Sequence, residues 1–143
     1  MDGRSGQDSK PLGDLKELEV KAKTEPIASF LDMQLLELTQ GYAKVKMKLK
    51  PEYQNFNGLV FGGIIMAIAD QVFAYASNSA AYPSYASQFN IHFISGAGID
   101  DELTAEGRVI RSGRRAGVSE MVVTNQDGKL IAKATGTTIP INQ

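Results

Sequence analysis

The chain has no cysteine among its 143 residues, and this absence excludes several kinds of chemistry. Disulfide bonds, thiolate metal sites and a cysteine nucleophile all need a sulfhydryl group. An excess of charge of one sign is also lacking, because 15 basic residues stand against 16 acidic ones. We therefore expect neither nucleic acid nor a membrane surface as a partner. No apolar segment typical of secretion precedes the rest of the sequence, so we expect a cytoplasmic protein.

Histidine is almost absent as well, since His92 is the only one. A lone imidazole cannot build a multi-histidine metal site, and the spacing of the carboxylates indicates none. His92 alternates with Ile91 and Phe93, which favours a structural or surface position over a catalytic one. We therefore expect no metal and no redox cofactor.

The length fits one domain with a sizeable core. Residues 1–25 are predicted to form a flexible tail followed by a short charged helix over residues 14–24. Asp14 is its candidate N-cap, and Pro26 stands after its end. Residues 26–143 are predicted to form the domain itself.

Alternating polar and apolar side chains predict most of the domain to be strands. The clearest case is residues 42–49, where Lys44 and Lys46 alternate with Val45 and Met47, the period of a strand with one buried face. Further strands are predicted over residues 33–38, 85–94, 103–111, 114–124 and 130–139. Turn residues at 112–113 and 127–128 indicate hairpins, so the sheet is expected to be antiparallel.

One long helix is predicted over residues 62–78, and it is apolar on nearly all faces. Such a helix is normally buried, by a curved sheet and, on any uncovered flank, by another subunit. Its only formal charge is Asp70, and an ionised carboxylate there costs several kcal/mol unless it is paired. The pair Gly62-Gly63 stands where the helix begins, with free N–H groups and the positive end of the dipole. A carboxylate two turns from such an end indicates an active site.

The order of these elements, together with Asn55, Gly58, Gly62-Gly63 and Asp70, resembles the hotdog-fold acyl-coenzyme A thioesterases, above all the phenylacetate-pathway type. That family has His-Gly-Gly, with Asn six positions before the His and an acidic residue nine after it. Asn55 and Asp70 stand at those distances from Phe61, which replaces the His. Similar pieces recur at residues 91–93, 101–105, 112–114 and 128–132, so the resemblance covers about residues 26–140. It implies an α+β hotdog fold, a six-stranded antiparallel sheet curved around one long buried helix.

The resemblance also implies hydrolysis of the thioester of an acyl-coenzyme A, with coenzyme A as part of the substrate. Asp70 would act as base or nucleophile, the Gly62 N–H as oxyanion donor, and Asn55 as a positioning group. The residues expected to contact substrate are Gly63, Phe61, Phe73, Ser87, Arg111 and Arg114. Relatives place each site at a dimer interface, so a homodimer or homotetramer is expected.

Other interpretations remain open for these residues. Asn55 could serve only a loop Asx turn, Gln88 could take the place of Ser87, and the arginines could form a solvated hairpin tip. The rival function is an acyl-coenzyme A binding or sensing module without turnover. Phe61 favours this rival because its ring cannot form ordinary hydrogen bonds, whereas Asp70 opposes it. A hotdog hydratase fits less well, since such enzymes pair a His with an acid.

Overall fold

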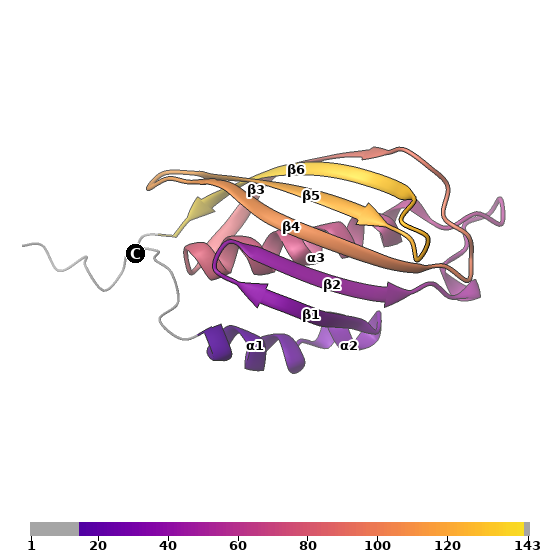
Figure 1. The fold of residues 1–143 in the computed structure, drawn as a ribbon, viewed down its shortest axis with the longest axis horizontal. Coiled ribbons are helices and arrows are strands. Elements are labelled where there is room, and N and C mark those ends of the chain that lie inside the picture. Colours follow the sequence, from indigo (N-terminus) through magenta and orange to yellow (C-terminus); the bar gives the residue numbers. More distant parts are fainter. Residues whose placement is uncertain (1–14, 142–143) are drawn as a thin grey trace, which may run out of the picture.

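The computed structural model describes residues 15–141 (Figure 1). The elements are α1 (Leu15–Lys23), α2 (Pro26–Phe30), β1 (Met33–Thr39), β2 (Tyr42–Lys48), the 3-10 turn η2 (Pro51–Tyr53), α3 (Gly62–Ala80), β3 (Ser84–Phe93), β4 (Glu102–Ser112), β5 (Gly117–Thr124) and β6 (Leu130–Pro140). The strands form one six-stranded sheet in the order β1-β2-β4-β5-β6-β3, with every neighbouring pair antiparallel. α3 packs against one face of this sheet, so the predicted α+β architecture is confirmed.

The bounds of the elements differ from the predicted ones by a few residues. β5 begins at Gly117 because residues 113–116 form the connection from β4, closed by a 2.9 Å hydrogen bond from the Gly113 N–H to the Ala116 carbonyl. α3 continues to Ala80. The helix predicted over residues 14–24 is α1, while its predicted cap, Asp14, lies outside the described residues.

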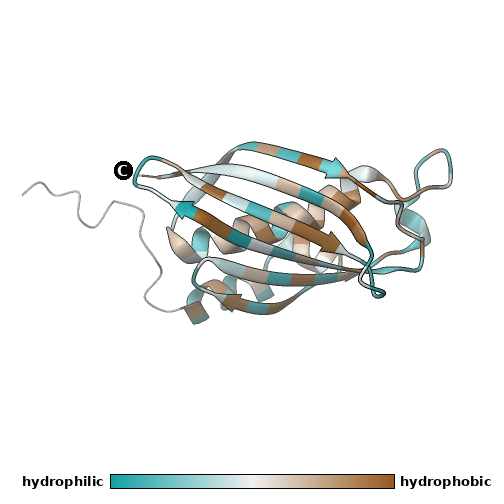
Figure 2. Cartoon of the chain, turned by 45° about the horizontal axis from the view of Figure 1, so that its top comes forward, coloured by the Kyte–Doolittle hydropathy of each residue, from teal (hydrophilic) through white to brown (hydrophobic). Residues whose placement is uncertain are grey.

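The core lies between α3 and the concave face of the sheet. The period of two seen in the sequence holds in β2, where Val45 and Met47 are fully buried while Lys44 and Lys46 lie on the other face. Figure 2 shows the same alternation of hydropathy along the neighbouring strands. α3 fills the core with its own apolar side chains, chiefly Ile65, Ile68, Val72, Phe73 and Ala76.

Two glycines of the sheet let α3 approach it closely. A Cβ atom at Gly107 of β4 would lie 2.7 Å from the carbonyl oxygen of Val72, and one at Gly136 of β6 would lie 2.5 Å from Phe73 Cζ. Atoms cannot approach so closely, so larger residues here would push α3 outward. α3 therefore packs in direct contact with β4 and β6, and this contact fixes the positions of Gly62 and Asp70.

One flank of α3 is left uncovered in the single chain. Met66, Asp70 and Ala74 are exposed and follow one another at intervals of four residues, the spacing of one helix face. Asp70, which the sequence predicts to be buried, is thus exposed. The cause is that the sheet curves over only part of the helix surface. We call the three residues the open flank of α3.

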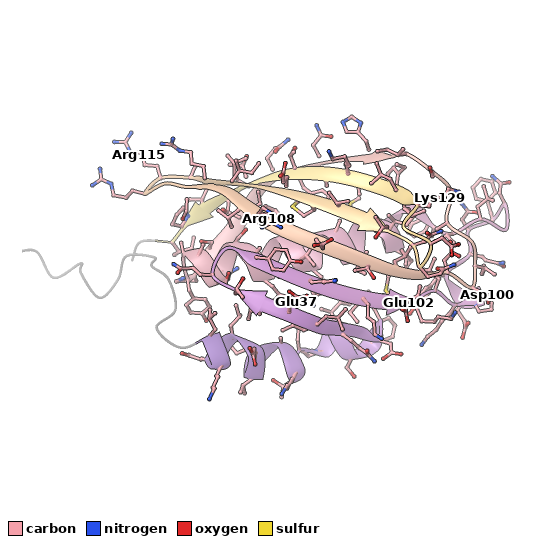
Figure 3. The ribbon with its side chains drawn as sticks, viewed as in Figure 1. Glu37, Asp100, Glu102, Arg108, Arg115 and Lys129 are labelled. Carbon is pink, nitrogen blue, oxygen red and sulfur yellow. The ribbon has the colours of Figure 1, made fainter. Side chains whose placement is uncertain are left out.

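The outer face of the sheet is charged. Lys44 lies 3.8 Å from Glu37, and Lys46 lies 3.9 Å from Glu102. Figure 3 shows Glu37, Glu102 and Arg108 along this face. Exposed ion pairs of this kind add little to the stability of a fold, but they keep this face of the sheet in contact with water. The predicted solvated face of residues 42–49 is confirmed.

The two N-terminal helices lie beside β1 (Figure 1) and are tied to α3 by a polar cluster. Glu25 Oε1 accepts hydrogen bonds from Tyr75 OH at 2.5 Å and from Gln71 Nε2 at 2.6 Å. Burial and the neighbouring Glu25 raise the pKa of Tyr75. Leu18 and Ala22 of α1 are buried at this junction. No helix within residues 15–141 is long and apolar enough to cross a membrane.

Candidate active site

The loop that leads into α3 is shaped by Asn55. Its side-chain Oδ1 accepts hydrogen bonds from the N–H groups of Asn57 at 2.9 Å and Leu59 at 3.1 Å. Gly58 supplies the positive φ of 77° that this turn needs. The side-chain oxygen of Asn55 is therefore occupied by hydrogen bonds within the loop. Its amide Nδ2 is the group left to meet a substrate.

The start of α3 presents free backbone donors. Phe61 is the N-cap residue, with φ −62° and ψ 127°, and its side chain makes no capping hydrogen bond. The first N–H groups of a helix have no intrahelical acceptor. Among the described residues, the hydrogen bonds give no partner to the N–H groups of Gly62 and Gly63. Both point out of the positive end of the helix dipole, which favours an anion or a developing oxyanion.

Two aromatic rings flank these donors. A Cβ atom at Gly62 would lie 3.4 Å from Phe93 Cζ, and one at Gly63 would lie 2.5 Å from Phe61 Cε2. The ring of Phe61 thus folds back over Gly63, and the ring of Phe93 lies beside Gly62. Apolar groups next to a donor lower the local dielectric, so a hydrogen bond made there is stronger than in open water.

Asp70 has no hydrogen bond or ion pair within the part of the chain that the structure describes. It lies on the open flank between Met66 and Ala74. Although the residue is exposed, the atoms around its carboxyl partly bury it, and this burial raises its pKa. A carboxylate with a raised pKa is a stronger base, and one without a partner is free to orient or deprotonate water.

Gly62 and Asp70 of the same chain cannot act on the same carbonyl group. Eight residues of helix separate them, a rise of ~12 Å. An oxyanion donor and a base must each lie ~3 Å from the reacting atoms. Side chains lean toward the helix N-terminus, which shortens this gap without closing it. One chain therefore does not bring Gly62 and Asp70 together at one carbonyl group.

The other predicted contact residues lie in different surroundings. Ser87 is exposed at a register shift of β3, between Ala86 and Gln88, and its Oγ donates to the Thr137 carbonyl at 3.3 Å. Such bulges re-aim a side chain and are common beside active sites. Phe73 is only 1% exposed, and its ring packs in the core against Phe89 of β3 and beside Gly136 of β6. Their contacts with substrate stay predictions.

The arginines lie far from the start of α3. Arg111 and Arg114 are exposed at the β4–β5 hairpin, and Gly117 next to it pairs with Thr138. Phe93, beside Gly62, pairs with Ala132 at the other end of β6. Six residues of strand span ~20 Å. Figure 3 shows this separation, with Arg115 at one end of the sheet and Lys129 at the other. One chain thus does not bring the arginines to Gly62.

His92 is exposed on β3, an edge strand, and pairs with Lys133. Residues 15–141 contain no group of three His, Asp or Glu side chains placed to hold a metal ion.

Sequence reasoning missed an apolar hollow beside Gly62. It has a volume of ≈300 Å³, and its walls include Leu59, Val60, Phe93 and Ile94. The available signal was the apolar end of β3, directly followed by the small residues 95–98. The interpretation of Phe93 as an ordinary strand residue hid its place at the start of α3.

The fold and the site together define a class of protein. An antiparallel sheet curved around one long helix is a hotdog fold, and here the helix start carries open N–H donors and the helix flank a free carboxylate. The model of the thioesterase superfamily matches residues 57–132, a span that includes Gly62, Asp70 and Phe93. The chain belongs to the thioesterase superfamily.

Relatives agree with this assignment. The chain is 36% identical over 121 residues to an Archaeoglobus fulgidus protein named "Putative esterase", covering 85% of this chain and 79% of that protein. It is 30% identical over 114 residues to the acyl-coenzyme A thioesterase PaaI of Escherichia coli K12, covering 80% and 81%. The structure of E. coli PaaI superimposes with a TM-score of 0.85, at 28% identity, over 89% of this chain and 92% of that one.

A hypothetical thioesterase protein of Streptococcus pneumoniae, whose crystal structure contains coenzyme A, is also similar. It superimposes with a TM-score of 0.78, at 25% identity, over 91% of this chain and 98% of that one. The likeness therefore extends over nearly the whole fold, including the helix that carries Asp70.

Proposed function

We propose that this protein hydrolyses the thioester bond of an acyl-coenzyme A. The observation that carries the proposal is Asp70, an unpaired carboxylate of raised pKa on the open flank of a helix whose start offers free N–H donors. The similarity to E. coli PaaI, an acyl-coenzyme A thioesterase, supports the substrate class.

In the proposed reaction the thioester carbonyl oxygen accepts a hydrogen bond from the Gly62 N–H. Asp70 of a second chain takes a proton from a water, whose oxygen attacks the carbonyl carbon. The negative charge that develops on the carbonyl oxygen lies at the helix start, where the dipole stabilises it. Collapse of this intermediate breaks the carbon–sulfur bond, and the leaving thiolate takes the proton from Asp70. Coenzyme A and the free acid are released, and the Asp70 carboxylate is restored. In the alternative route the Asp70 carboxylate attacks the carbonyl carbon and coenzyme A leaves as the thiolate. Water then hydrolyses the resulting anhydride, which gives the same products.

Asn55 and the arginines have supporting roles in this proposal. The amide Nδ2 of Asn55 would hold the water or the thioester, because its Oδ1 is engaged in the loop. Arg111 and Arg114 would bind the phosphates of coenzyme A, for which a guanidinium is well suited. Since they lie far from Gly62 of their own chain, they would serve a site on a neighbouring chain.

We expect a stable homo-oligomer, at least a dimer. The separation of Gly62 from Asp70 leaves the site incomplete in one chain, and the open flank together with exposed Phe61 and Phe93 offers an apolar surface to a second copy. Light scattering at micromolar concentration should give a mass of at least twice that of the chain. A monomeric mass would contradict both the assembly and the shared site.

A thiol-release assay across short, long and aromatic acyl-coenzyme A esters tests the function itself. Steady release of coenzyme A from at least one ester is expected. The rival function, an acyl-coenzyme A binding module, is favoured by Phe61 in place of a hydrogen-bonding His. If calorimetry detects tight binding of an ester that the protein does not hydrolyse, the binding module is the correct function.

Phe61→His is expected to leave the rate unchanged or to raise it. Phe61 is 56% exposed at the helix mouth, so the smaller imidazole should cost little stability. The Gly62 N–H belongs to the backbone and survives the change, while the imidazole adds a polar contact. The measurement is kcat and KM for the best ester. A large loss of kcat in a folded variant would show that the Phe61 ring itself is needed.

A further inference from the structure

The hollow beside Gly62 is apolar on nearly every side. Leu59 and Val60 come from the loop before α3, Ile65 from its first turn, and Phe93 and Ile94 from the end of β3. Ser95 is the only polar side chain that lines it. Apolar walls of this kind stabilise an apolar group by removing it from water.

The position of the hollow ties it to the reaction proposed above. Gly62 lines the hollow with its backbone, and Phe93 forms both a wall and the contact beside Gly62. A thioester whose carbonyl oxygen meets the Gly62 N–H therefore has the hollow within reach of one of its two substituents. These are the acyl group and the thiol end of coenzyme A.

A second hollow, of ≈520 Å³, lies near the far half of α3 and is less suited to an apolar group. Its lining includes Lys21, Glu25 and Asn78, whose polar groups would lose water if an acyl chain covered them. It does not include Gly62. The hollow beside Gly62 is thus the better place for an apolar substituent.

We propose that the hollow beside Gly62 binds the acyl group of the substrate and limits its size. This assignment rests on the proposed thioesterase function, in which the thioester carbonyl oxygen accepts a hydrogen bond from the Gly62 N–H. A volume of ≈300 Å³ equals that of about ten water molecules at about 30 Å³ each. The substrate class is therefore an apolar acyl group of modest size, a short-to-medium chain or a single ring.

A substitution at Gly96 can test the role of the hollow. It lines the hollow, a Cβ atom there would meet nothing within 4 Å, and its φ lies outside the left-handed region. Gly96→Leu therefore adds an apolar side chain at the wall of the hollow, and its Cβ atom has room there. Asp100→Leu is the matched control, because Asp100 is exposed in the same loop and lies outside the lining.

The experiment measures binding, so it does not depend on turnover. Calorimetry gives the Kd of coenzyme A and of its S-ethyl, S-butyl, S-hexyl and S-octyl thioethers, which cannot be hydrolysed. With wild-type protein, affinity should rise by up to about fourfold per added methylene until the hollow is full. Gly96→Leu should flatten this rise at a shorter chain and leave the Kd of coenzyme A unchanged. Asp100→Leu should behave as wild type.

Two results would overturn the assignment. An unchanged dependence on chain length in Gly96→Leu would place the acyl group elsewhere. An equal loss for coenzyme A and for every thioether would place the thiol end of coenzyme A in the hollow. A protein with the expected chain-length dependence that releases no thiol from any ester would fail as a thioesterase while keeping the acyl pocket, so the two failures are distinguishable.

Discussion

Asp70→Asn should lower kcat by ~10² or more and leave acyl-coenzyme A binding intact, since general-base catalysis contributes ~10²–10⁴. Asn has nearly the same shape but cannot take a proton or attack as an anion. The change should not destabilise the fold, because Asp70 makes no hydrogen bond or ion pair among residues 15–141. The measurements are kcat from thiol release and Kd from calorimetry.

The raised pKa of Asp70 adds a pH signature to this experiment. A base must be deprotonated to act, so wild-type kcat should fall with decreasing pH at a higher pH than an unperturbed Asp would give. The stability of the folded protein depends on pH in the opposite direction from kcat. Between the ordinary pKa and the raised one, the folded state binds more protons than the unfolded state, so stability falls as pH rises. Asp70→Asn should remove this fall, and its Tm at neutral pH should equal or exceed that of wild type.

Asp127→Asn is the matched control for Asp70→Asn. It makes the same chemical change at an exposed hairpin turn, where Asn-Gly is as favourable as Asp-Gly. Its kcat should equal that of wild type. Full turnover by Asp70→Asn would remove Asp70 from the mechanism, whatever the control shows.

Gly62→Pro should lower kcat by ~10²–10³, the usual cost of removing one oxyanion donor. Proline lacks the N–H, yet it is well tolerated as the first residue of a helix. The preceding residue, Phe61, is extended at φ −62° and ψ 127°, the conformation that proline imposes on its predecessor. The variant therefore deletes one donor and keeps the helix. Thiol release and far-ultraviolet circular dichroism provide the two measurements.

Gly62→Ala distinguishes the effect of a missing N–H donor from the effect of a changed shape of the site. Alanine keeps the N–H, and its Cβ would lie 3.4 Å from the edge of the exposed Phe93 ring, a contact that a small ring movement relieves. Its activity should stay close to that of wild type. If Gly62→Ala and Gly62→Pro lose the same activity, crowding rather than the missing N–H is the cause.

Much of the fold could be predicted from local patterns. The strict alternation of residues 42–49 fixed one face of β2, and the absence of Pro and Gly after Gly63 fixed the length of α3 within two residues. The exception was the start of β5. The segment 113–116 could continue a strand by composition, and only the Gly113–Ala116 hydrogen bond makes it a turn.

The site was harder to predict because it depends on distances between elements. Spacing along the chain placed Asp70 on the same helix as Gly62, but it could not show that the sheet leaves Asp70 exposed. Arg111 and Gly62 fall at opposite ends of the sheet because of the order in which strands pair, which no local pattern encodes. The engagement of Asn55 Oδ1 in its loop also follows from the turn as folded.

The eight-residue separation of Gly62 and Asp70 on one rigid helix has a genetic consequence. A chain with Gly62→Pro still carries a sound Asp70, and a chain with Asp70→Asn still carries a sound Gly62. In the proposed dimer with shared sites, expression of the two inactive alleles together should give mixed dimers that each contain one site with both groups intact. Random pairing of equal amounts makes about half the dimers mixed, so about a quarter of wild-type activity returns. Two defective genes would thus restore activity when they are expressed together. No activity would return if each site lay within one chain.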